Sequence, residues 1–194
     1  MKLSILIPTV RSRIDRTLPL LLDEIERQAR GLPVEVLALY DNKVHSVGVK
    51  RNKLVQAATG LYLAFVDDDD WVDPDYVSLI LEHVDVRPAP EVIVFDSILI
   101  VDGVFSKRCV YGVEFAAEET ADLWKGKPAH THAWAEWVCR KHSYPNLTVG
   151  EDRKWSMAAC REVRVQARIP EILYHYRRST TQSETRPVEG SDSR

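Results

Sequence analysis

The stretch that most constrains this chain runs from Leu61 to Tyr76, where an apolar segment leads directly into four consecutive aspartates. Residues 61–66 form a continuous apolar run that is too short for an independent helix and lacks polar alternation, which is typical of a parallel strand buried on both faces. The aspartates at 67–70 then stand at the carboxyl end of that strand, where open α/β sheets bind ligands. Because four adjacent carboxylates repel one another, this position favours a cation site.

The same run has a simpler interpretation, because acidic runs are commonly solvated turns. Here, however, an apolar strand precedes the aspartates, and the pair Asp73-Pro74 follows them. Asp73 is suited to cap a helix and Pro74 to occupy its first position. Ordered elements on both sides would hold the carboxylates in a fixed geometry. The sequence therefore favours a divalent metal site over a solvated loop.

Composition indicates one globular domain without a membrane partner. The chain has 194 residues, of which 45% are hydrophobic and 28% are charged, which is enough for a core of its own. No apolar run reaches the roughly 20 residues that a membrane-spanning helix requires, and the first ten residues make a poor signal peptide. Cys109, Cys139 and Cys160 lack CxxC spacing, which argues against disulfides and structural zinc. We expect a cytoplasmic protein with reduced cysteines.

The net charge of −3 is unevenly distributed. Acidic residues are in excess over residues 1–139, whereas basic residues are in excess over 140–186. A basic segment is most simply a solvated face, but it also suits an acidic acceptor such as nucleic acid. The sequence leaves both interpretations open.

Apolar periodicity predicts alternating strands and helices in the first half, which implies parallel strands with right-handed crossovers. Gly31 and Gly60 would end the first two helices. The expected strands are 2–8, 34–40 and 61–66, and the expected helices are 18–30, 47–58 and one that starts at Pro74.

The second half departs from this alternation. Asp102-Gly103, a favoured tight-turn pair, predicts a β-hairpin over residues 97–111. The density of tryptophan between residues 124 and 137 indicates core packing or, as the alternative, a sugar platform. The other expected elements are a strand at 91–96, an acidic helix at 117–124, a helix at 153–160, strands at 163–168 and 172–176, and a disordered tail from 179.

Taken in order, the motifs resemble those of the family 2 glycosyltransferases. The resemblance covers residues 2–178 and rests on SILIPT, LYDN, KRNKLVQAATG, FVDDDDWVDPDY, GEDRKW and LYHYR. It implies the GT-A fold: a Rossmann-like α/β domain whose central, mostly parallel sheet is flanked by helices, with a small β-hairpin region on the acceptor side. Residues 1–178 would form this single domain and 179–194 a disordered tail.

The resemblance also implies an inverting transferase that takes a sugar from a nucleotide diphosphate sugar, chiefly a UDP-sugar. The chain is most similar to compact single-domain members found in phage genomes, some of which are thought to glycosylate modified bases in DNA. Such an enzyme would work in the host cytoplasm. Its acceptor would be either a saccharide or a hydroxymethylated base in DNA.

Individual roles follow from the matched motifs. Asp41 would contact the uracil base and Arg51 would line the nucleotide pocket. Asp67 and Asp69 match the DxD positions, which touch the ribose and hold Mn²⁺ or Mg²⁺, with Asp70 as a further metal ligand. The catalytic base is matched by Asp152, beside Glu151. The other implied donor contacts are Pro8, Thr9, Arg11, Asp68, His175 and Arg177, and the implied acceptor contacts are His130 and Trp134.

Two alternatives from other classes remain. A non-catalytic nucleotide- or metal-binding module would use the acidic loop only for binding. A nucleotidyltransferase would also place carboxylates and a metal at a strand end, but the first strand is not followed by a glycine-rich phosphate loop containing lysine. Measurable release of UDP from a UDP-sugar separates the transferase from the binding module.

Overall fold

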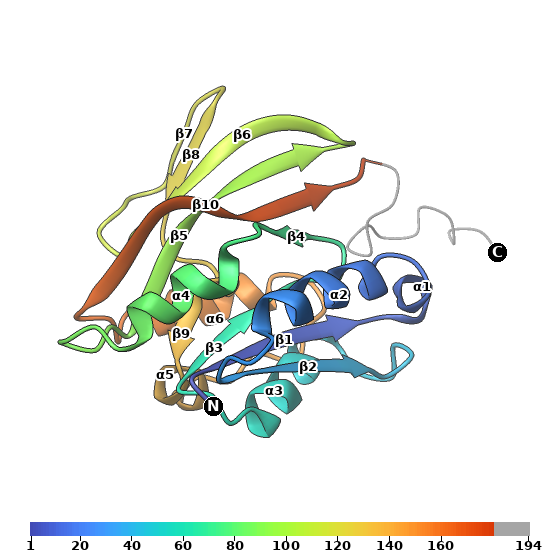
Figure 1. Ribbon diagram of the computed structural model, residues 1–194. Coiled ribbons are helices and arrows are strands. Elements are labelled where there is room, and N and C mark those ends of the chain that lie inside the picture. The colour runs from blue at the N-terminus through green and yellow to red at the C-terminus, as the bar shows by residue number, and fades with distance from the viewer. Residues whose placement is uncertain (181–194) are drawn as a thin grey trace.

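The computed structural model describes residues 1–180, which form one mixed sheet with helices on both faces (Figure 1). The strand order is β2-β1-β3-β9-β5-β6-β8-β7, and β10 pairs with β5 and β4. The strands are β1 (Leu3–Thr9), β2 (Val34–Tyr40), β3 (Tyr62–Phe65), β4 (Trp71–Val72), β5 (Val92–Val101), β6 (Val104–Tyr111), β7 (Glu118–Glu119), β8 (Leu123–Gly126), β9 (Ala133–Ala135) and β10 (Gln166–Arg178). The helices are α1 (Arg11–Ile14), α2 (Leu18–Ala29), α3 (Val47–Ala57), α4 (Tyr76–Val84), α5 (Glu136–Lys141) and α6 (Glu151–Ala159).

The predicted parallel strands are confirmed. β1 pairs in parallel with β2 on one side and with β3 on the other, and every residue of β1 is buried. On its far side β3 pairs with the antiparallel strand β9, which the sequence did not predict and which links the first half of the sheet to β5. The carboxyl ends of β1 and β3 therefore lie together at one edge.

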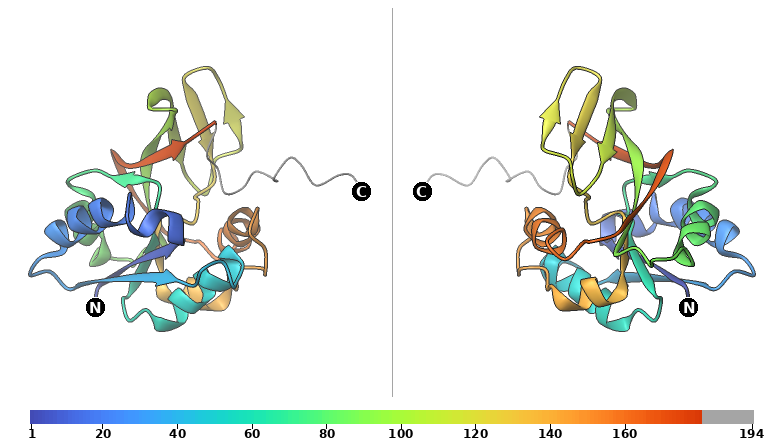
Figure 2. Two further views of the ribbon diagram at one scale, coloured as in Figure 1. Left: turned by 90° about the vertical axis from the view of Figure 1, so that its right-hand side faces the viewer. Right: turned by 90° about the vertical axis from the view of Figure 1, so that its left-hand side faces the viewer.

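Helices cover the two faces of this sheet separately. Figure 2 shows α2 and α4 on one face and α3, α5 and α6 on the other. In α2, Leu18, Leu21 and Ile25 are buried, which is the spacing expected of a helix with one apolar stripe. Among the described residues, no helix combines the length and apolar character needed to cross a lipid bilayer.

The helix predicted to start at Pro74 begins at Tyr76 instead. The Asp73 carboxylate accepts a hydrogen bond from the backbone N–H of Asp75, and the Asp73 carbonyl accepts one from Tyr76, so Asp73 forms a turn rather than a helix cap. The two residues before it form β4, which pairs with β10. That pairing is a tertiary contact, and a local pattern cannot reveal it.

Two further predictions about the second half were wrong. The acidic segment at 117–124 is not a helix, because β7 and β8 form a hairpin there and β8 extends the ladder of β6. The two short strands expected near the C-terminus are one strand, β10, whose register against β5 shifts between Ile169 and Ile172. Pro170 lies in this irregularity, where a missing backbone N–H is tolerated.

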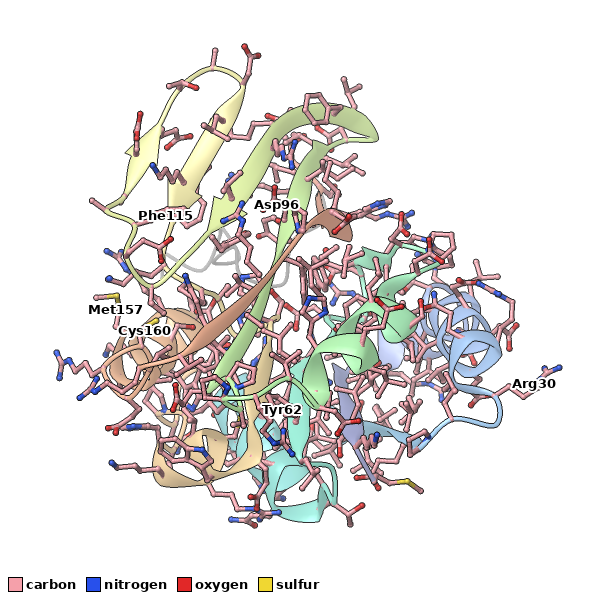
Figure 3. The ribbon with its side chains drawn as sticks, turned by 60° about the vertical axis from the view of Figure 1, so that its left-hand side comes forward. Arg30, Tyr62, Asp96, Phe115, Met157 and Cys160 are labelled. Atoms are coloured by element: carbon pink, nitrogen blue, oxygen red, sulfur yellow. The ribbon has the colours of Figure 1, made fainter. Side chains whose placement is uncertain are left out.

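The predicted hairpin is confirmed, and its turn has the expected geometry. Asp102 and Gly103 both have positive φ, 48° and 84°, as a two-residue turn between β5 and β6 requires. Along β5, Asp96 is 1% exposed and is paired with Arg108 and Arg168. Figure 3 shows Asp96 on the part of the sheet that projects beyond the helical layers. The ion pairs of Asp96 therefore join β5 to β6 and β10 in this projecting part of the sheet.

Cys109, Cys139 and Cys160 are free thiols. The tail predicted to be disordered falls mainly at 181–194, outside the described residues.

Gly60 has a different role from the one predicted. Helix α3 ends at Ala57, and a Cβ on Gly60 would lie 2.5 Å from Ser4 Oγ and 2.6 Å from the Ser4 backbone nitrogen. The Gly60 N–H also donates to Ser4 Oγ at 2.8 Å. Glycine is needed here because β1 passes too close for any side chain.

Gly60→Ala is therefore expected to lower the free energy of unfolding by roughly 1–3 kcal/mol, the usual range for overpacking. Urea denaturation measures the change. Gly112→Ala is the matched control, because the three atoms nearest to its Cβ would all belong to the end of the Glu114 side chain rather than to the backbone. Equal stability of the two variants would contradict the close-packing interpretation.

Candidate active site

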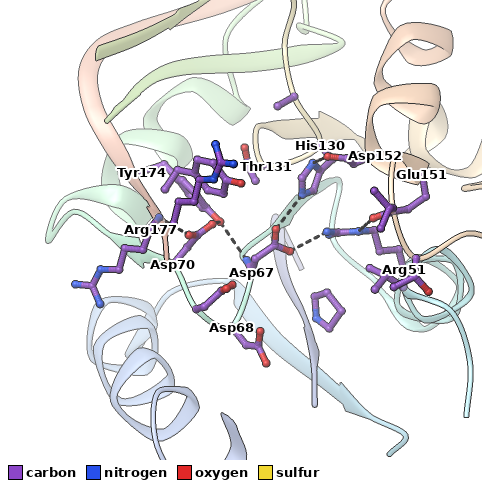
Figure 4. Close-up of a pocket in the computed structure, with 18 of the residues that line it drawn as sticks. Arg51, Asp67, Asp68, Asp70, His130, Thr131, Glu151, Asp152, Tyr174 and Arg177 are labelled. Atoms are coloured by element: carbon purple, nitrogen blue, oxygen red, sulfur yellow. Dashed lines mark hydrogen bonds and ion pairs between the residues drawn. The ribbon is translucent and has the colours of Figure 1, made fainter. Parts of the chain in front are cut away.

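A cavity of about 470 Å³ opens at the carboxyl ends of β1 and β3. The loop after β1 and the start of α3 form one wall, and the end of β10, the loop before β9 and the start of α6 form the others (Figure 4). All four aspartates at 67–70 contribute to its lining. The predicted clustering of acidic residues at this edge is thus observed, and each carboxylate has its own surroundings.

Asp67 lies at the centre of the cavity. Its Oδ1 accepts a hydrogen bond of 2.8 Å from Arg51 Nη2, and its Oδ2 lies 3.4 Å from His130 Nε2. Burial alone would raise the pKa of Asp67, but Arg51 and His130 outweigh it and hold the pKa below its usual value. Asp67 is therefore a stable carboxylate.

Asp68 fastens the loop that follows β1. Its carboxylate accepts hydrogen bonds from Thr9 Oγ1 at 2.7 Å and from the Val10 backbone N–H at 3.3 Å, and it forms an ion pair with Arg13. Arg13 also reaches Asp69, with Nη2 2.7 Å from Oδ2. Only 3% of the Asp68 side chain is exposed, so its carboxylate is already satisfied within the protein.

Asp69 and Asp70 carry charge that the protein does not fully balance. Burial, together with the neighbouring carboxylates, raises the pKa of Asp69 to about 6 despite its contact with Arg13. Burial and repulsion from Asp67 and Asp69 also raise the pKa of Asp70, although its oxygens accept hydrogen bonds from Tyr174 Oη at 2.5 Å and the Arg177 N–H at 2.7 Å. Without a ligand, the cavity has an excess of negative potential.

The acidic pair at the start of α6 faces this cluster. Gly150 precedes the helix with φ of 77°, a conformation that favours glycine. Glu151 is 4% exposed and its Oε1 lies 3.4 Å from Arg51 Nε; burial raises its pKa, although Arg51 opposes the shift. The Asp152 side chain is 41% exposed, and its Oδ2 lies 3.7 Å from His130 Nδ1. Of the two acids, Asp152 is accessible to a substrate.

The wall formed by α3 supplies two buried cations. Lys50 is 3% exposed and donates to the Thr9 carbonyl at 3.1 Å, and its Nζ lies 3.8 Å from Asp41 Oδ1. Arg51 packs over the Phe65 ring at 4.9 Å, and its Nη1 is buried with no hydrogen-bond partner among the described residues. Both cations lie on the wall where the resemblance to family 2 glycosyltransferases predicts the nucleotide pocket, which Arg51 was expected to line.

Ten of the predicted site residues line this cavity, but five do not. Thr9 is buried and donates to Asp68. Asp41 contacts His45 and Lys50 and does not itself line the cavity. Arg11 is exposed and faces Asp15. Trp134 is fully buried against Trp155, with ring centroids 5.2 Å apart, so it has no surface for an acceptor. His175 does not line the cavity. The residues that do line it are Pro8, Arg51, Asp67, Asp68, Asp69, Asp70, His130, Glu151, Asp152 and Arg177.

Sequence reasoning missed several tyrosines of the cavity. Tyr174 and Tyr176 line it from β10, and Tyr111 lines it from β6 beside Ser97. Successive side chains along a strand point to opposite faces, so Tyr174 and Tyr176 share a face from which His175 is excluded. The alternation of side-chain direction along the LYHYR segment could have identified both tyrosines, once one of them was known to face the cavity.

Comparison with known proteins decides the family. A family model described as glycosyl transferase family 2 matches residues 11–144. The chain belongs to this family. Among solved structures, S. aureus TarS 1–349 superposes with a TM-score of 0.65 at 17% identity, covering 91% of this chain and 60% of that one. The same fragment in complex with UDP-GlcNAc gives 0.65 at 16% identity, covering 92% and 59%.

These likenesses establish the GT-A fold of this family 2 glycosyltransferase. EpsH of Bacillus subtilis (strain 168), which carries the name of a glycosyltransferase, is 49% identical over 35 residues, or 18% of this chain and 10% of EpsH. The chain thus spans about three fifths of the TarS fragment and a tenth of EpsH.

The raised pKa of Asp69 predicts that the excess negative charge of the cavity destabilises the folded protein. The folded protein holds this proton more tightly than the unfolded chain, so ionisation of Asp69 lowers stability as the pH rises through about 6. In the absence of divalent ions, Asp69→Asn should melt at a higher temperature than the wild type at pH 8. The difference should shrink towards pH 4.

Thermal melts in EDTA at several pH values measure this difference. Asp23→Asn, at an exposed position of α2, is the control and should follow the wild type. A lower melting temperature for Asp69→Asn at pH 8 would show instead that the ion pair with Arg13 dominates.

Proposed function

We propose that this family 2 glycosyltransferase moves a sugar from a nucleotide diphosphate sugar, preferably a UDP-sugar, to an acceptor hydroxyl with inversion at the anomeric carbon. One observation carries the proposal: the aspartates at the end of β3 and the exposed Asp152 at the start of α6 line the same cavity. S. aureus TarS, which has a similar fold, has been crystallised with UDP-GlcNAc and with UDP, and this supports the choice of donor.

The donor would lie between the α3 wall and the aspartates. Lys50 and Arg51 are buried cations on that wall, and the buried Arg51 Nη1 still lacks a hydrogen-bond partner among residues 1–180. A buried N–H group without a hydrogen-bond acceptor is unfavourable, and a phosphate or ribose oxygen of the bound nucleotide would accept this hydrogen bond. Asp41, which is held by His45 and lies close to Lys50, would accept an N–H from the base.

The residues fit a divalent metal that is completed by the substrate. Within residues 1–180 no group of three or more acidic, histidine or cysteine side chains is arranged so that it could hold a metal ion. Mg²⁺, however, is usually bound by one or two carboxylates together with substrate phosphates. The excess negative charge at Asp69 and Asp70 is the observation that favours Mg²⁺ or Mn²⁺, with one or two of Asp67, Asp69 and Asp70 as the protein ligands. Such an ion would neutralise charge on the departing diphosphate.

Asp152 is the proposed general base. A base must reach the proton it removes, and the exposed carboxylate of Asp152 can do so, whereas Glu151 is buried against Arg51. The acceptor hydroxyl attacks the anomeric carbon as its proton passes to Asp152, and the bond to the nucleotide diphosphate breaks. One displacement from the face opposite the leaving group inverts the configuration.

We keep two acceptors as candidates. The cavity wall opposite α3 includes Tyr111 and Tyr176, with 48% of Tyr176 exposed, and aromatic rings of this kind suit a saccharide. Arg177 and Arg178 also line the cavity, which favours the alternative of a hydroxymethylated base in DNA. In a gel-retardation assay, absence of DNA binding at low salt would contradict the DNA alternative, because phosphate contacts are strongest there.

Incubation with Mn²⁺ and a panel of UDP-sugars should release UDP by slow hydrolysis. Asp152→Asn should lower this rate by about 100-fold or more while its affinity for UDP, measured by calorimetry, stays near the wild-type value. Glu162→Gln, which alters an exposed contact with Lys141, is the control. Binding of UDP without any release from the panel would favour the non-catalytic module.

Removal of the metal is a separate test. In EDTA, UDP should bind at least tenfold more weakly, because repulsion between the diphosphate and Asp69 and Asp70 is then uncompensated. Added Mn²⁺ should restore the affinity in the wild type but not in Asp69→Ala. Equal affinity with and without the ion would remove the proposed metal ligands.

A further inference from the structure

His130 occupies an unusual position between the donor aspartates and the proposed base. Its Nε2 lies 3.4 Å from Asp67 Oδ2 and its Nδ1 lies 3.7 Å from Asp152 Oδ2. Figure 4 shows the imidazole between these two carboxylates. A single ring thus connects the end of β3 with the start of α6, two elements that are far apart in the chain.

The ring is held in place by the loop before β9. Only 9% of the His130 side chain is exposed, and the ring packs on Phe65 with centroids 6.3 Å apart. The preceding carbonyl, of Ala129, accepts hydrogen bonds from Trp134 Nε1 at 2.9 Å and from the His132 N–H at 3.3 Å. These bonds close a turn around His130 and anchor it to Trp134, so His130 can hold a partner in place.

Arg51 makes the corresponding link for the other acid of α6. Its Nη2 contacts Asp67 and its Nε contacts Glu151. The two neighbouring acids of α6 are therefore both tied to Asp67, Glu151 through Arg51 and Asp152 through His130. The difference lies in their exposure, because Glu151 is buried and Asp152 is not.

An exposed aspartate at a helix start has several accessible rotamers, and fixing it in one costs conformational entropy. Within residues 1–180 the only hydrogen bond to the Asp152 carboxylate is a local one, from the Arg153 backbone N–H at 2.7 Å. The His130 ring, at 3.7 Å, lies within ion-pair distance. The imidazole is thus the tertiary contact that directs this carboxylate towards the donor aspartates.

We propose that His130 is a positioning residue, which holds the Asp152 carboxylate in the orientation needed to receive the acceptor proton and couples it to Asp67. The role rests on the proposed function. It differs from the direct acceptor contact predicted for His130 from the sequence. A direct contact would affect ligand affinity, whereas positioning affects the rate after binding.

Two substitutions of His130 test its contact with Asp152 separately from its contact with Asp67. In His130→Asn the side-chain amide stands close to the position of Nδ1, so it can reach Asp152 but not Asp67. In His130→Gln the amide stands close to Nε2 and can reach Asp67 but not Asp152. His130→Ala removes both contacts. His142→Asn is the matched control, because His142 also faces a carboxylate, Glu162 at 3.2 Å, and does not line the cavity.

The readouts are the turnover number for UDP release from the best UDP-sugar of the panel, and the affinity for UDP with Mn²⁺. His130→Ala should lower turnover by about 10- to 100-fold, a typical range for a misplaced catalytic group, with UDP affinity unchanged within about twofold. His130→Asn should recover most of the turnover, and His130→Gln should recover little. The His142 variant should match the wild type.

Three results would overturn the proposal: unchanged turnover in His130→Ala, a loss of UDP affinity that accounts for the whole effect, or better recovery by Gln than by Asn. Hydrogen exchange gives a test that needs no turnover. The Lys154 amide, which donates to the Gly150 carbonyl in the first turn of α6, should exchange faster in His130→Ala than in the wild type or His130→Asn, and equal exchange would contradict positioning. If the wild type releases no UDP but the exchange result holds, the proposed function fails and the positioning of Asp152 stands.

Discussion

The ion pair between Arg51 and Asp67 is the interaction on which the rest of the site depends. Both side chains are largely withdrawn from water, and Arg51 also contacts Glu151. Removing one partner of such a pair typically costs about 3–5 kcal/mol, because the other charge remains buried and uncompensated. The pair joins α3, the end of β3 and the start of α6. It therefore sets the distance between the metal-binding aspartates and the base in the proposed mechanism.

Around this pair, four chemically identical residues fall into three different electrostatic situations. Asp67 is stabilised as an anion by Arg51 and His130, and Asp68 fastens the loop after β1 through Thr9 and Arg13. Asp69 and Asp70 keep raised pKa values because burial and mutual repulsion exceed their local compensation. A site with this distribution of charge is stabilised by a cation or by a cation with its anionic substrate. In the proposed mechanism, relief of this unbalanced charge would favour binding of the cation and the substrate.

The fold positions this chemistry through contacts between distant segments. The carboxyl ends of β1 and β3 bring the first loop and the aspartates together, as parallel pairing requires. β4 and β10 then pair although they are about 100 residues apart in sequence, and this brings Tyr174 and Arg177 onto Asp70. The short β9 strand places His130 beside Asp152. Each of these contacts depends on which strands become neighbours, and that is a property of the whole sheet.

The sequence by itself determined the parallel strands, α2, α3, the Asp102-Gly103 hairpin and the acidic edge, because each is encoded by residues close together in the chain. It also placed Asp67, Asp69 and Asp152 at one site, through motifs in a family order. Only the tertiary structure decided that residues 117–124 pair as strands, that α4 starts at Tyr76, and that Gly60 serves close packing against Ser4. The structure also excludes Trp134 and His175 from the cavity, adds Tyr174 and Tyr176 to it, and places the ring of His130 between Asp67 and Asp152. The physical reason is that strand pairing and burial are settled between segments far apart in sequence, where local propensity carries no information.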